Sequence, residues 1–478
     1  MSDRNDEYDL VVIGSGPAGE KAAAQAAYFG RRVALVEKSK ILGGRAVGNA
    51  GIPTKTLRET ALYITGFQRR DVYGLGLSLA PDCAIDHLRA RTSEVVATME
   101  ERVRRNVQRH GIELVRGKAR LGDARSVTVA GQDGERRLRA DRIIIATGSR
   151  PFHPPGIDFG DPDIHDSESL LAVREPFGSL VVLGGGPVGC EYASIFTALG
   201  VDVTLVDRAP RLVGFLDHEV SGGLADIFEG MGMTLMLGQG LADVGRAGGR
   251  LTVTLPDGRD LHPDKTLVAS GRGGDNEGLG LEDAGVALDA RGRVMVDERF
   301  QTTVDGVYAA GDVIGPPALA SVSMEQGRVA ACYACNIPFK ETVDPLAPFG
   351  VYSVPEAAMA GLTEQAAQER QIDYEVGMGL LAANSRARIA GAEEGFVKLV
   401  FAREDRALLG VHLLGENATE LVHIGQAVIH LGGTIDYFIH STFNVPTYSE
   451  AFKYAAYDGL QRLARSGRNS SPRGPRGP

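Results

Sequence analysis

The sequence has no tryptophan, and only 4 of its 478 residues are cysteine. So few cysteines in a chain of this length exclude a fold that depends on a disulfide framework. The chain also lacks any uncharged apolar stretch near the roughly 18 residues that a membrane span requires. Its first residues show no basic start followed by an apolar run, as a signal peptide would. We therefore expect a soluble cytoplasmic protein with no membrane partner.

Positive charge is also in deficit, because 51 lysines and arginines stand against 61 acidic residues, a formal net charge of −10. A folded surface with this balance is a poor partner for nucleic acid. The apolar share of 43% and the charged share of 23% are typical of a globular chain. Only residues 466–478 depart from this composition, and we predict that they form a disordered basic tail.

Glycine, by contrast, is plentiful, with 62 residues, nearly twice the usual share of roughly 7%. Residues 8–37 and 179–207 share one pattern: an apolar strand, Gly-x-Gly-x-x-Gly, a helix, and a second strand that ends in an acid. In both copies the acid lies 23 residues after the first glycine. One such motif is a weak signal, but its repetition in this context predicts two dinucleotide-binding βαβ units. The predicted contacts are Gly14, Ser15, Gly16, Pro17, Ala18, Gly19, Glu37 and Lys38 in the first unit, and Gly184, Gly186, Pro187, Val188, Gly189 and Asp207 in the second.

The acids that end the second strands, Glu37 and Asp207, are expected to bind the adenosine ribose of each dinucleotide. In the second unit Arg208 and Arg211 follow the acid. Guanidinium groups there could hold a 2′-phosphate by bidentate hydrogen bonds, and the site would then accept NADP(H) as well as NAD(H). The alternative, that both arginines are solvated surface charges, is equally open.

A third signal follows the apolar residues 307–310, where Gly311 precedes Asp312. Alone, a Gly-Asp pair indicates a turn. In a chain with two nucleotide-binding units we interpret it as a flavin site, with Asp312 bonded to a ribityl hydroxyl. The glycine-rich segment from Gly43 to Lys55 follows directly on the Glu37 strand.

Together these motifs resemble those of the flavoprotein disulfide reductases, the group of dihydrolipoamide dehydrogenase and glutathione reductase, from about residue 8 to residue 465. The resemblance implies bound FAD, nicotinamide nucleotides as substrates, and a homodimer or higher homo-oligomer formed through the C-terminal domain. We predict an α/β fold with two Rossmann-like domains and a C-terminal α+β interface domain. The expected limits are 1–153 and 279–346 for the FAD-binding domain, with helices in 56–110, then 154–278 for the NAD(P)-binding domain and 347–465 for the interface domain.

Two parts of the chemistry of that group are missing. The positions of its redox-active cysteines are Ala46 and Gly51 here, and the position of its acid–base histidine is Asn444. Their joint absence favours a changed reaction. One branch of the family, the soluble Si-specific pyridine nucleotide transhydrogenases, has this profile, and residues 189–196 and 442–450 are similar to it. That branch usually keeps the first cysteine, which Ala46 replaces.

For Lys55 and Glu191 the resemblance implies an ion pair beside the flavin N5 and a catalytic role. Lys55 would stabilise the reduced flavin, and Glu191 would orient Lys55 and line the nicotinamide site. The alternatives are a surface lysine and a glutamate that favours the helix dipole. The remaining predicted cofactor-binding residues are Gly43, Gly44, Ala119, Thr147, Gly148 and Gly271.

With no dithiol to drain electrons, we predict ping-pong exchange of hydride between NADPH and NAD through FAD, since the cofactor carries the chemistry. An NAD(P)H diaphorase or quinone reductase of the same fold stays an alternative, as does a non-enzymatic flavin- and NAD(P)H-binding redox sensor. Cys332 and Cys335 form a CxxC within a helical run. We expect them to be buried small side chains rather than a redox pair, and we predict no metal site.

Overall fold

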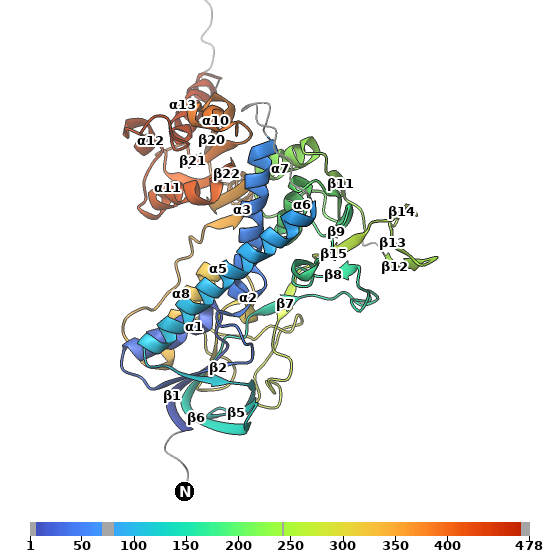
Figure 1. Ribbon diagram of the computed structural model, residues 1–478. Helices are drawn as coiled ribbons and strands as arrows, with labels where there is room; N and C mark the ends of the chain where they lie inside the picture. Colours follow the sequence, from blue (N-terminus) through green and yellow to red (C-terminus); the bar gives the residue numbers. More distant parts are fainter. Residues whose placement is uncertain (1–5, 69–80, 241–242, 470–478) are drawn as a thin grey trace, which may run out of the picture.

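The computed structural model of the chain describes residues 6–68, 81–240 and 243–469, drawn in Figure 1. Its larger sheets have seven, five and five strands, and smaller sheets of three and two strands accompany them. In the order of the chain, two units that combine parallel strands with helices are followed by an antiparallel C-terminal sheet. Within the described ranges, no helix is long and apolar enough to cross a membrane. The mixed α/β class expected from the sequence is therefore confirmed.

The first sheet is built around β1 (Glu7–Ile13), which pairs in parallel with β2 (Val33–Glu37) and β6 (Gly134–Ile145). A strand from much later in the chain, β17 (Val307–Ala309), pairs in parallel with β6. This pairing brings the Gly311–Asp312 turn beside the first glycine loop. The sheet is completed by β3 (Glu113–Arg116), β4 (Lys118–Asp123) and β5 (Ser126–Gly131).

Helix α1 (Pro17–Tyr28) packs closely against α8 (Ala320–Ala334) because both helices present small side chains. Ala22, Ala23 and Ala26 are completely buried, and a Cβ added to Gly327 would lie 2.1 Å from a backbone oxygen of α1. The predicted helical stretch contains α3 (Gly51–Gln68) and α5 (Pro81–Arg109), so it begins earlier than residue 56. Residues 69–80 lie outside the described residues.

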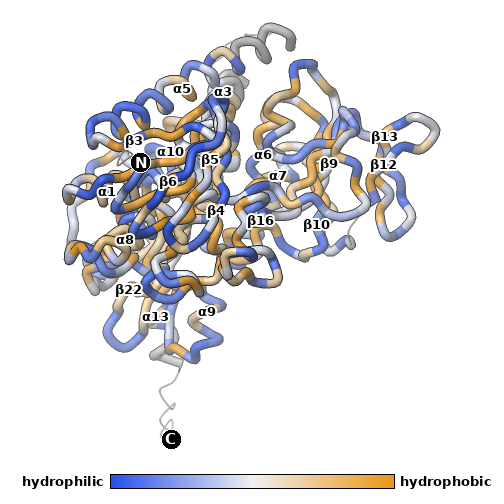
Figure 2. Tube along the Cα trace, turned by 90° about the horizontal axis from the view of Figure 1, so that it is seen from below, coloured by the Kyte–Doolittle hydropathy of each residue, from blue (hydrophilic) through white to orange (hydrophobic). Residues whose placement is uncertain are grey.

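The second nucleotide-binding unit has an entirely parallel sheet, in the order β11-β10-β9-β15-β8. Figure 2 shows this unit to one side of the first, with β16 between them. The antiparallel pair of β7 (Ser149–Pro151) and β16 (Arg272–Gly274) connects the two units. The second unit consists of β8 (Ile164–His165), β9 (Ser179–Leu183), α6 (Pro187–Ala198), β10 (Asp202–Asp207), α7 (His218–Gly230), β11 (Thr234–Leu237), β15 (Lys265–Val268) and the meander β12 (Asp243–Ala247), β13 (Arg250–Thr254) and β14 (Asp260–Leu261).

The C-terminal sheet is antiparallel, in the order β18-β19-β22-β21-β20, and the helices α11 and α13 pack against it. Helix α13 (Glu450–Asn469) runs past the predicted start of the tail, so that boundary at residue 466 is four residues too early. Residues 470–478 lie outside the described residues. The other elements are β18 (Phe349–Val351), β19 (Glu356–Gly361), α9 (Glu364–Glu369), β20 (Tyr374–Leu380), α10 (Ser385–Ala390), β21 (Phe396–Ala402), β22 (Leu408–Gly415), α11 (Ala418–His430) and α12 (Asp436–His440).

Candidate active site

The first glycine loop brings backbone segments closer together than side chains would allow. Gly14 has a φ of +105°, and a Cβ on Gly19 would lie 1.8 Å from the Gly14 carbonyl oxygen. A Cβ on Gly44, at the start of α2 (Gly44–Gly48), would lie 2.8 Å from the Cα of Gly16. Gly16 caps α1 with no side-chain hydrogen bond, and Pro17 occupies its first turn. The free N–H groups of this helix start are therefore available to an anion.

Glu37 lies at the end of β2 and organises that loop. One carboxylate oxygen accepts hydrogen bonds from the amide and the hydroxyl of Ser15, at 2.9 and 2.6 Å, and the other accepts from the Ser39 amide at 2.7 Å. Lys38 pairs with Asp275 at 2.9 Å. Ala119 is buried on β4, away from the loop in sequence but in the same sheet. The ribose-binding role of Glu37 stays a prediction.

Thr147, Gly148 and Asp312 form one wall of the candidate site, and this wall contains a buried polar atom without a hydrogen-bond partner among the described residues. The hydroxyl oxygen of Thr147 is buried without a hydrogen-bond partner in the described structure. Gly148 has a φ of +74°, which favours glycine. Asp312 accepts hydrogen bonds from Ser149 at 2.8 Å and from Ser323 at 3.1 Å. A buried hydroxyl without a partner is costly, so this wall fits a bound polar group such as the phosphate and ribityl chain of FAD.

Gly311 approaches the start of α1, and Gly43 approaches the first glycine loop. Gly311 has a φ of +85°, and a Cβ there would lie 2.9 Å from that of Ala18, so the Gly311–Asp312 turn contacts the first turn of α1. Gly43 has a φ of +97°, and its amide donates to the Ser15 hydroxyl at 3.1 Å. The structure thus brings together the segments around residues 14–19, 43–44, 147–148 and 311–312, which the sequence presents far apart.

The second glycine loop repeats the geometry of the first. Gly184 has a φ of +119°, and a Cβ on Gly189 would lie 1.7 Å from the Gly184 carbonyl oxygen. Gly186 precedes Pro187, the first residue of α6, and a Cβ there would meet nothing within 4 Å. Val188 follows in the first turn and is partly buried. Open space over the helix start is what a pyrophosphate needs.

The loop after β10 folds back over this site. Asp207 accepts hydrogen bonds from the amides of Gly185 and Ala209, and the Val213 amide donates to the Gly185 carbonyl oxygen at 2.8 Å. Arg208 and Arg211 lie on this loop, and both are exposed. Neither forms an ion pair with another described residue. Gly271, with a φ of +115°, lies at the connection between the units, where its carbonyl oxygen accepts from Phe152.

Lys55 and Glu191 meet although 136 residues separate them. The Lys55 Nζ lies 2.7 Å from a carboxylate oxygen of Glu191. Lys55 extends from α3 and retains about a third of its exposure, while Glu191 is buried on α6. A bond between a lysine of one nucleotide-binding unit and a glutamate of the other places a charged pair at the junction of the two.

Residues 46 and 51, the positions of the dithiol in the resembling family, lie close together, but neither residue contains sulfur. A Cβ on Gly51 would lie 3.5 Å from the Cα of Ala46 and 3.0 Å from its carbonyl oxygen. Asn444, at the position of the acid–base histidine, is exposed and precedes a cis Val445–Pro446 bond. Residues 46 and 51 therefore lie close together, but the sequence has neither the two thiols nor the histidine at these positions.

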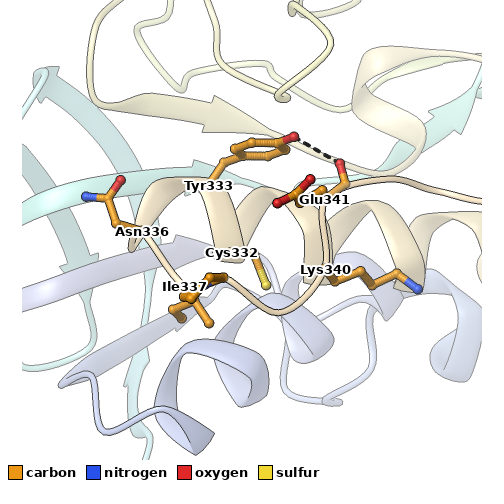
Figure 3. Close-up of a pocket in the computed structure, with 7 residues that line it drawn as sticks. Cys332, Tyr333, Asn336, Ile337, Lys340 and Glu341 are labelled. Carbon is orange, nitrogen blue, oxygen red and sulfur yellow. Dashed lines mark hydrogen bonds between the residues drawn. The ribbon is translucent and has the colours of Figure 1, made fainter.

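The CxxC cysteines lie elsewhere, at the end of α8. Both are buried; burial raises the pKa of Cys332 and raises that of Cys335 to about 11. A cavity of about 250 Å³ adjoins Cys332, and Figure 3 shows Tyr333 at its edge, bonded at 3.1 Å to the carbonyl oxygen of Glu341. Protonated, buried thiols are poor nucleophiles, which agrees with the packing role expected for these cysteines.

One cluster at the connection between the units was missed by the sequence reasoning. Arg45, next to Ala46, pairs with Glu168 and with Asp275, both at 2.7 Å. The cluster borders a cleft of about 570 Å³. No local pattern marks Arg45, because its partners lie 123 and 230 residues away. The residues that line the cleft are Arg45, Arg150, Pro151, Phe152, His153, Asp166, Glu168, Gly273, Gly274, Asn276, Arg291 and Gly292.

Two glycine loops that face open helix starts, a flavin-type Gly-Asp turn and a charged pair between them define the class of two-dinucleotide oxidoreductases. The chain belongs to the pyridine nucleotide-disulphide oxidoreductase family, whose model matches residues 8–327. The model of the dimerisation domain of that family matches residues 347–456.

The chain is similar to proteins named soluble pyridine nucleotide transhydrogenase. One from Mycobacterium bovis is 42% identical over 461 residues, which cover 96% of this chain and 98% of that protein. One from Erwinia tasmaniensis is 38% identical over 461 residues, with coverage of 96% and 99%. These similarities extend over nearly the whole of both chains.

Solved structures of flavoproteins share the fold. The HOCl-induced flavoprotein disulfide reductase RclA from Escherichia coli is 28% identical, with a TM-score of 0.85 over 94% of this chain and 99% of that one. LpdA from Mycobacterium tuberculosis is 26% identical, also with a TM-score of 0.85 and the same coverage. The family and these flavoprotein neighbours support the predicted use of FAD and NAD(P)H.

Proposed function

We propose that this chain is an FAD-dependent pyridine nucleotide transhydrogenase, which exchanges hydride between NADPH and NAD in a ping-pong sequence. The relatives that carry this name, at 38–42% identity over nearly the full length, support the activity. The proposal that no disulfide takes part rests on Ala46 and Gly51, which stand where the family has its two redox-active cysteines. The chain keeps the Lys55–Glu191 pair, at 2.7 Å, but has no sulfur at the two positions that face each other nearby.

FAD would be held by the first glycine loop and the wall opposite it. The start of α1, at Gly16 and Pro17, would offer free N–H groups to the pyrophosphate, and Glu37 would bind the ribose. Thr147 has a buried hydroxyl without a hydrogen-bond partner among the described residues, and Asp312 accepts a hydrogen bond from Ser149, two residues after Thr147. When bound, FAD supplies a two-electron centre that takes hydride from one nicotinamide and returns it to another.

The charged pair contributes electrostatics rather than proton transfer. We infer that the Lys55 ammonium lies where negative charge develops when hydride arrives, and a fixed charge of this kind lowers the barrier without reorganisation. Glu191 holds the ammonium in place through one oxygen. Since hydride passes between cofactors, this chemistry requires no acid–base group at position 444, which is asparagine.

The second glycine loop would bind the nicotinamide nucleotides in turn. Asp207 would bind an adenosine ribose, as Glu37 would in the first unit. We propose that Arg208 and Arg211, exposed and without an ion-pair partner among the described residues, bind the 2′-phosphate of NADP(H). The match of residues 347–456 to a dimerisation domain indicates a homo-oligomer, and we propose a homodimer.

Anaerobic stopped-flow spectroscopy tests the function. Bound flavin is first reduced with NADPH, and NAD or a quinone is then added in separate reactions. We expect NAD to reoxidise the flavin at a rate that accounts for turnover. Reoxidation by a quinone alone would refute the transhydrogenase proposal and favour a diaphorase. Measurable reduction of lipoamide or oxidised glutathione would refute the argument from the missing dithiol.

A paired comparison tests the phosphate site. The double variant Arg208→Ala/Arg211→Ala removes both guanidinium groups, and Arg250→Ala, an exposed arginine on β13, serves as the matched control. We expect the double variant to raise KM for NADPH at least tenfold while KM for NADH changes less than twofold, since loss of a charge-assisted contact costs about 1.5–3 kcal/mol. Equal changes for both nucleotides would remove these arginines from the site.

A further inference from the structure

The C-terminal domain reaches the Lys55–Glu191 pair through Tyr352, just after β18. The Tyr352 amide donates to the second carboxylate oxygen of Glu191 at 3.0 Å. The Tyr352 ring lies beneath the Lys55 ammonium, with 4.8 Å between Nζ and the ring centroid. Both oxygens of Glu191 are therefore engaged, one by Lys55 and one by Tyr352. One residue of a third domain contacts both members of the pair.

The segment that carries Tyr352 is held by both nucleotide-binding units. Arg58, one turn after Lys55 on α3 and only 4% exposed, donates from Nε to the Ser353 carbonyl oxygen at 2.9 Å. Its guanidinium also pairs with Glu356 at 2.9 Å. From α6, the Ser194 hydroxyl accepts the Val354 amide at 3.0 Å. Tyr352 thus has little freedom to move relative to the helices that carry Lys55 and Glu191.

Glu356 connects the same segment to the helix layer of the C-terminal domain. Its second oxygen accepts from the amide and the hydroxyl of Thr419, at 2.8 and 2.7 Å, at the start of α11. The buried Arg58–Glu356 pair is therefore hydrogen-bonded at both ends, as a buried ion pair must be if it is to hold its geometry. Burial raises the pKa of Tyr352, so its ring is a neutral phenol.

We propose that Tyr352 is a positioning residue for hydride exchange: its amide orients Glu191 and its ring holds the Lys55 ammonium in place at the junction of the three domains. This inference rests on the proposed function for the role of Lys55. An ammonium is attracted to the face of an aromatic ring by the ring quadrupole, more strongly where water is excluded. The amide contact survives any substitution except proline, whereas the ring contact does not, so side-chain variants isolate the ring.

Three variants of the FAD-loaded protein separate positioning from folding. Tyr352→Leu removes the ring face, Tyr352→Phe keeps it, and Tyr28→Leu changes an exposed tyrosine at the far end of α1. The readouts are the midpoint potential of the bound flavin, the rate constant of its reduction by NADPH, and the melting temperature.

For Tyr352→Leu we expect a more negative midpoint potential and a five- to tenfold slower reduction. The reason is that a less firmly held ammonium stabilises the negative charge of the reduced state less well. A tenfold change in the equilibrium ratio of a two-electron couple corresponds to about 30 mV. Tyr352→Phe and Tyr28→Leu should stay within twofold of the unmodified protein in rate and unchanged in potential.

Unchanged potential and rate in Tyr352→Leu would overturn the proposal. If that variant does not retain FAD, Tyr352→Met takes its place, because methionine fills similar space without a ring face. Loss of FAD from both, with normal binding by Tyr352→Phe, would indicate a structural role and also overturn it. Failure of NAD to reoxidise the unmodified protein would refute the proposed function, whereas the potential shift tests the positioning independently.

Discussion

Replacing Lys398 by methionine removes an ammonium that three carboxylates surround where the second nucleotide-binding unit meets the C-terminal sheet. Its Nζ lies 2.9 Å from Asp217 and 2.5 Å from both Glu219 and Glu364. The three acids come from the start of α7 and the start of α9, and their oxygens lie within 4.8 Å of one another. Lys398 and Asp217 have no exposed surface. The ammonium therefore neutralises a negative cluster that cannot be fully solvated.

The expected decrease in the free energy of unfolding depends on which of the three carboxylates stay buried once the ammonium is removed. Glu219 is 50% exposed and Glu364 is 29% exposed, so both can turn toward water. Asp217 cannot, and removing one partner of a buried pair costs roughly 3–5 kcal/mol. Because two of the three acids can relax, we expect a loss near the lower end, about 3 kcal/mol. Methionine has a similar volume, so the cavity contribution should be small.

Urea unfolding of the FAD-loaded protein, followed by far-ultraviolet circular dichroism, measures the change as a shift of the midpoint. Lys340→Met is the matched control, since Lys340 pairs with Glu325 at 2.6 Å but both side chains are about a third exposed. We expect that control to lose less than about 1 kcal/mol. Adding Asp217→Asn to Lys398→Met should restore part of the loss, because no buried charge then lacks a partner. Equal losses for Lys398→Met and Lys340→Met would refute the reasoning.

Three further changes test other parts of the structure. Gly44→Val would force a Cβ to within 2.8 Å of the Gly16 Cα, so we expect the purified protein to lose its flavin absorbance while it still melts cooperatively; a normal flavin content would contradict the close approach. Ala46→Cys combined with Gly51→Cys should form a disulfide in air, since a Cβ at 51 lies 3.5 Å from the Cα of residue 46; thiols that alkylate without prior reduction would show that it does not. Burial alone would raise the pKa of Asp217, but the neighbouring imidazole and ammonium groups outweigh it and lower that pKa below 3.8. Its stabilisation should therefore be present above about pH 4 and lost as the pH falls further, and Asp217→Asn should flatten the acid limb of a plot of urea midpoint against pH; an unchanged limb would contradict that assignment.

The two glycine loops could be predicted from the sequence because their requirements are local. A positive φ at Gly14 or Gly184 and a close helix–strand approach at Gly19 or Gly189 each demand glycine at a defined spacing. Each of these requirements involves residues of only one or two neighbouring strands and helices.

The contacts between units could not be predicted in this way. The pairing of Lys55 with Glu191 was expected only through the family resemblance. The two residues are 136 positions apart, and no pattern in the sequence around either one indicates the other as its partner. Arg45 and Tyr352 carried no signal. Lys398 did carry one, because a lysine inside the apolar strand β21 must find partners if it is buried, but the sequence does not say which acids meet it.

The sequence by itself therefore determined the two glycine-rich βαβ units, the Gly311–Asp312 turn and the absence of the dithiol at Ala46 and Gly51. Each of these depends on residue identity at fixed spacing along one stretch of chain. Only the tertiary structure decided which charges meet: Glu191 with Lys55 and Tyr352, and Lys398 with its acids. The physical reason is that such contacts depend on how three separately built units pack together, and side chains distant in sequence become partners only through that packing.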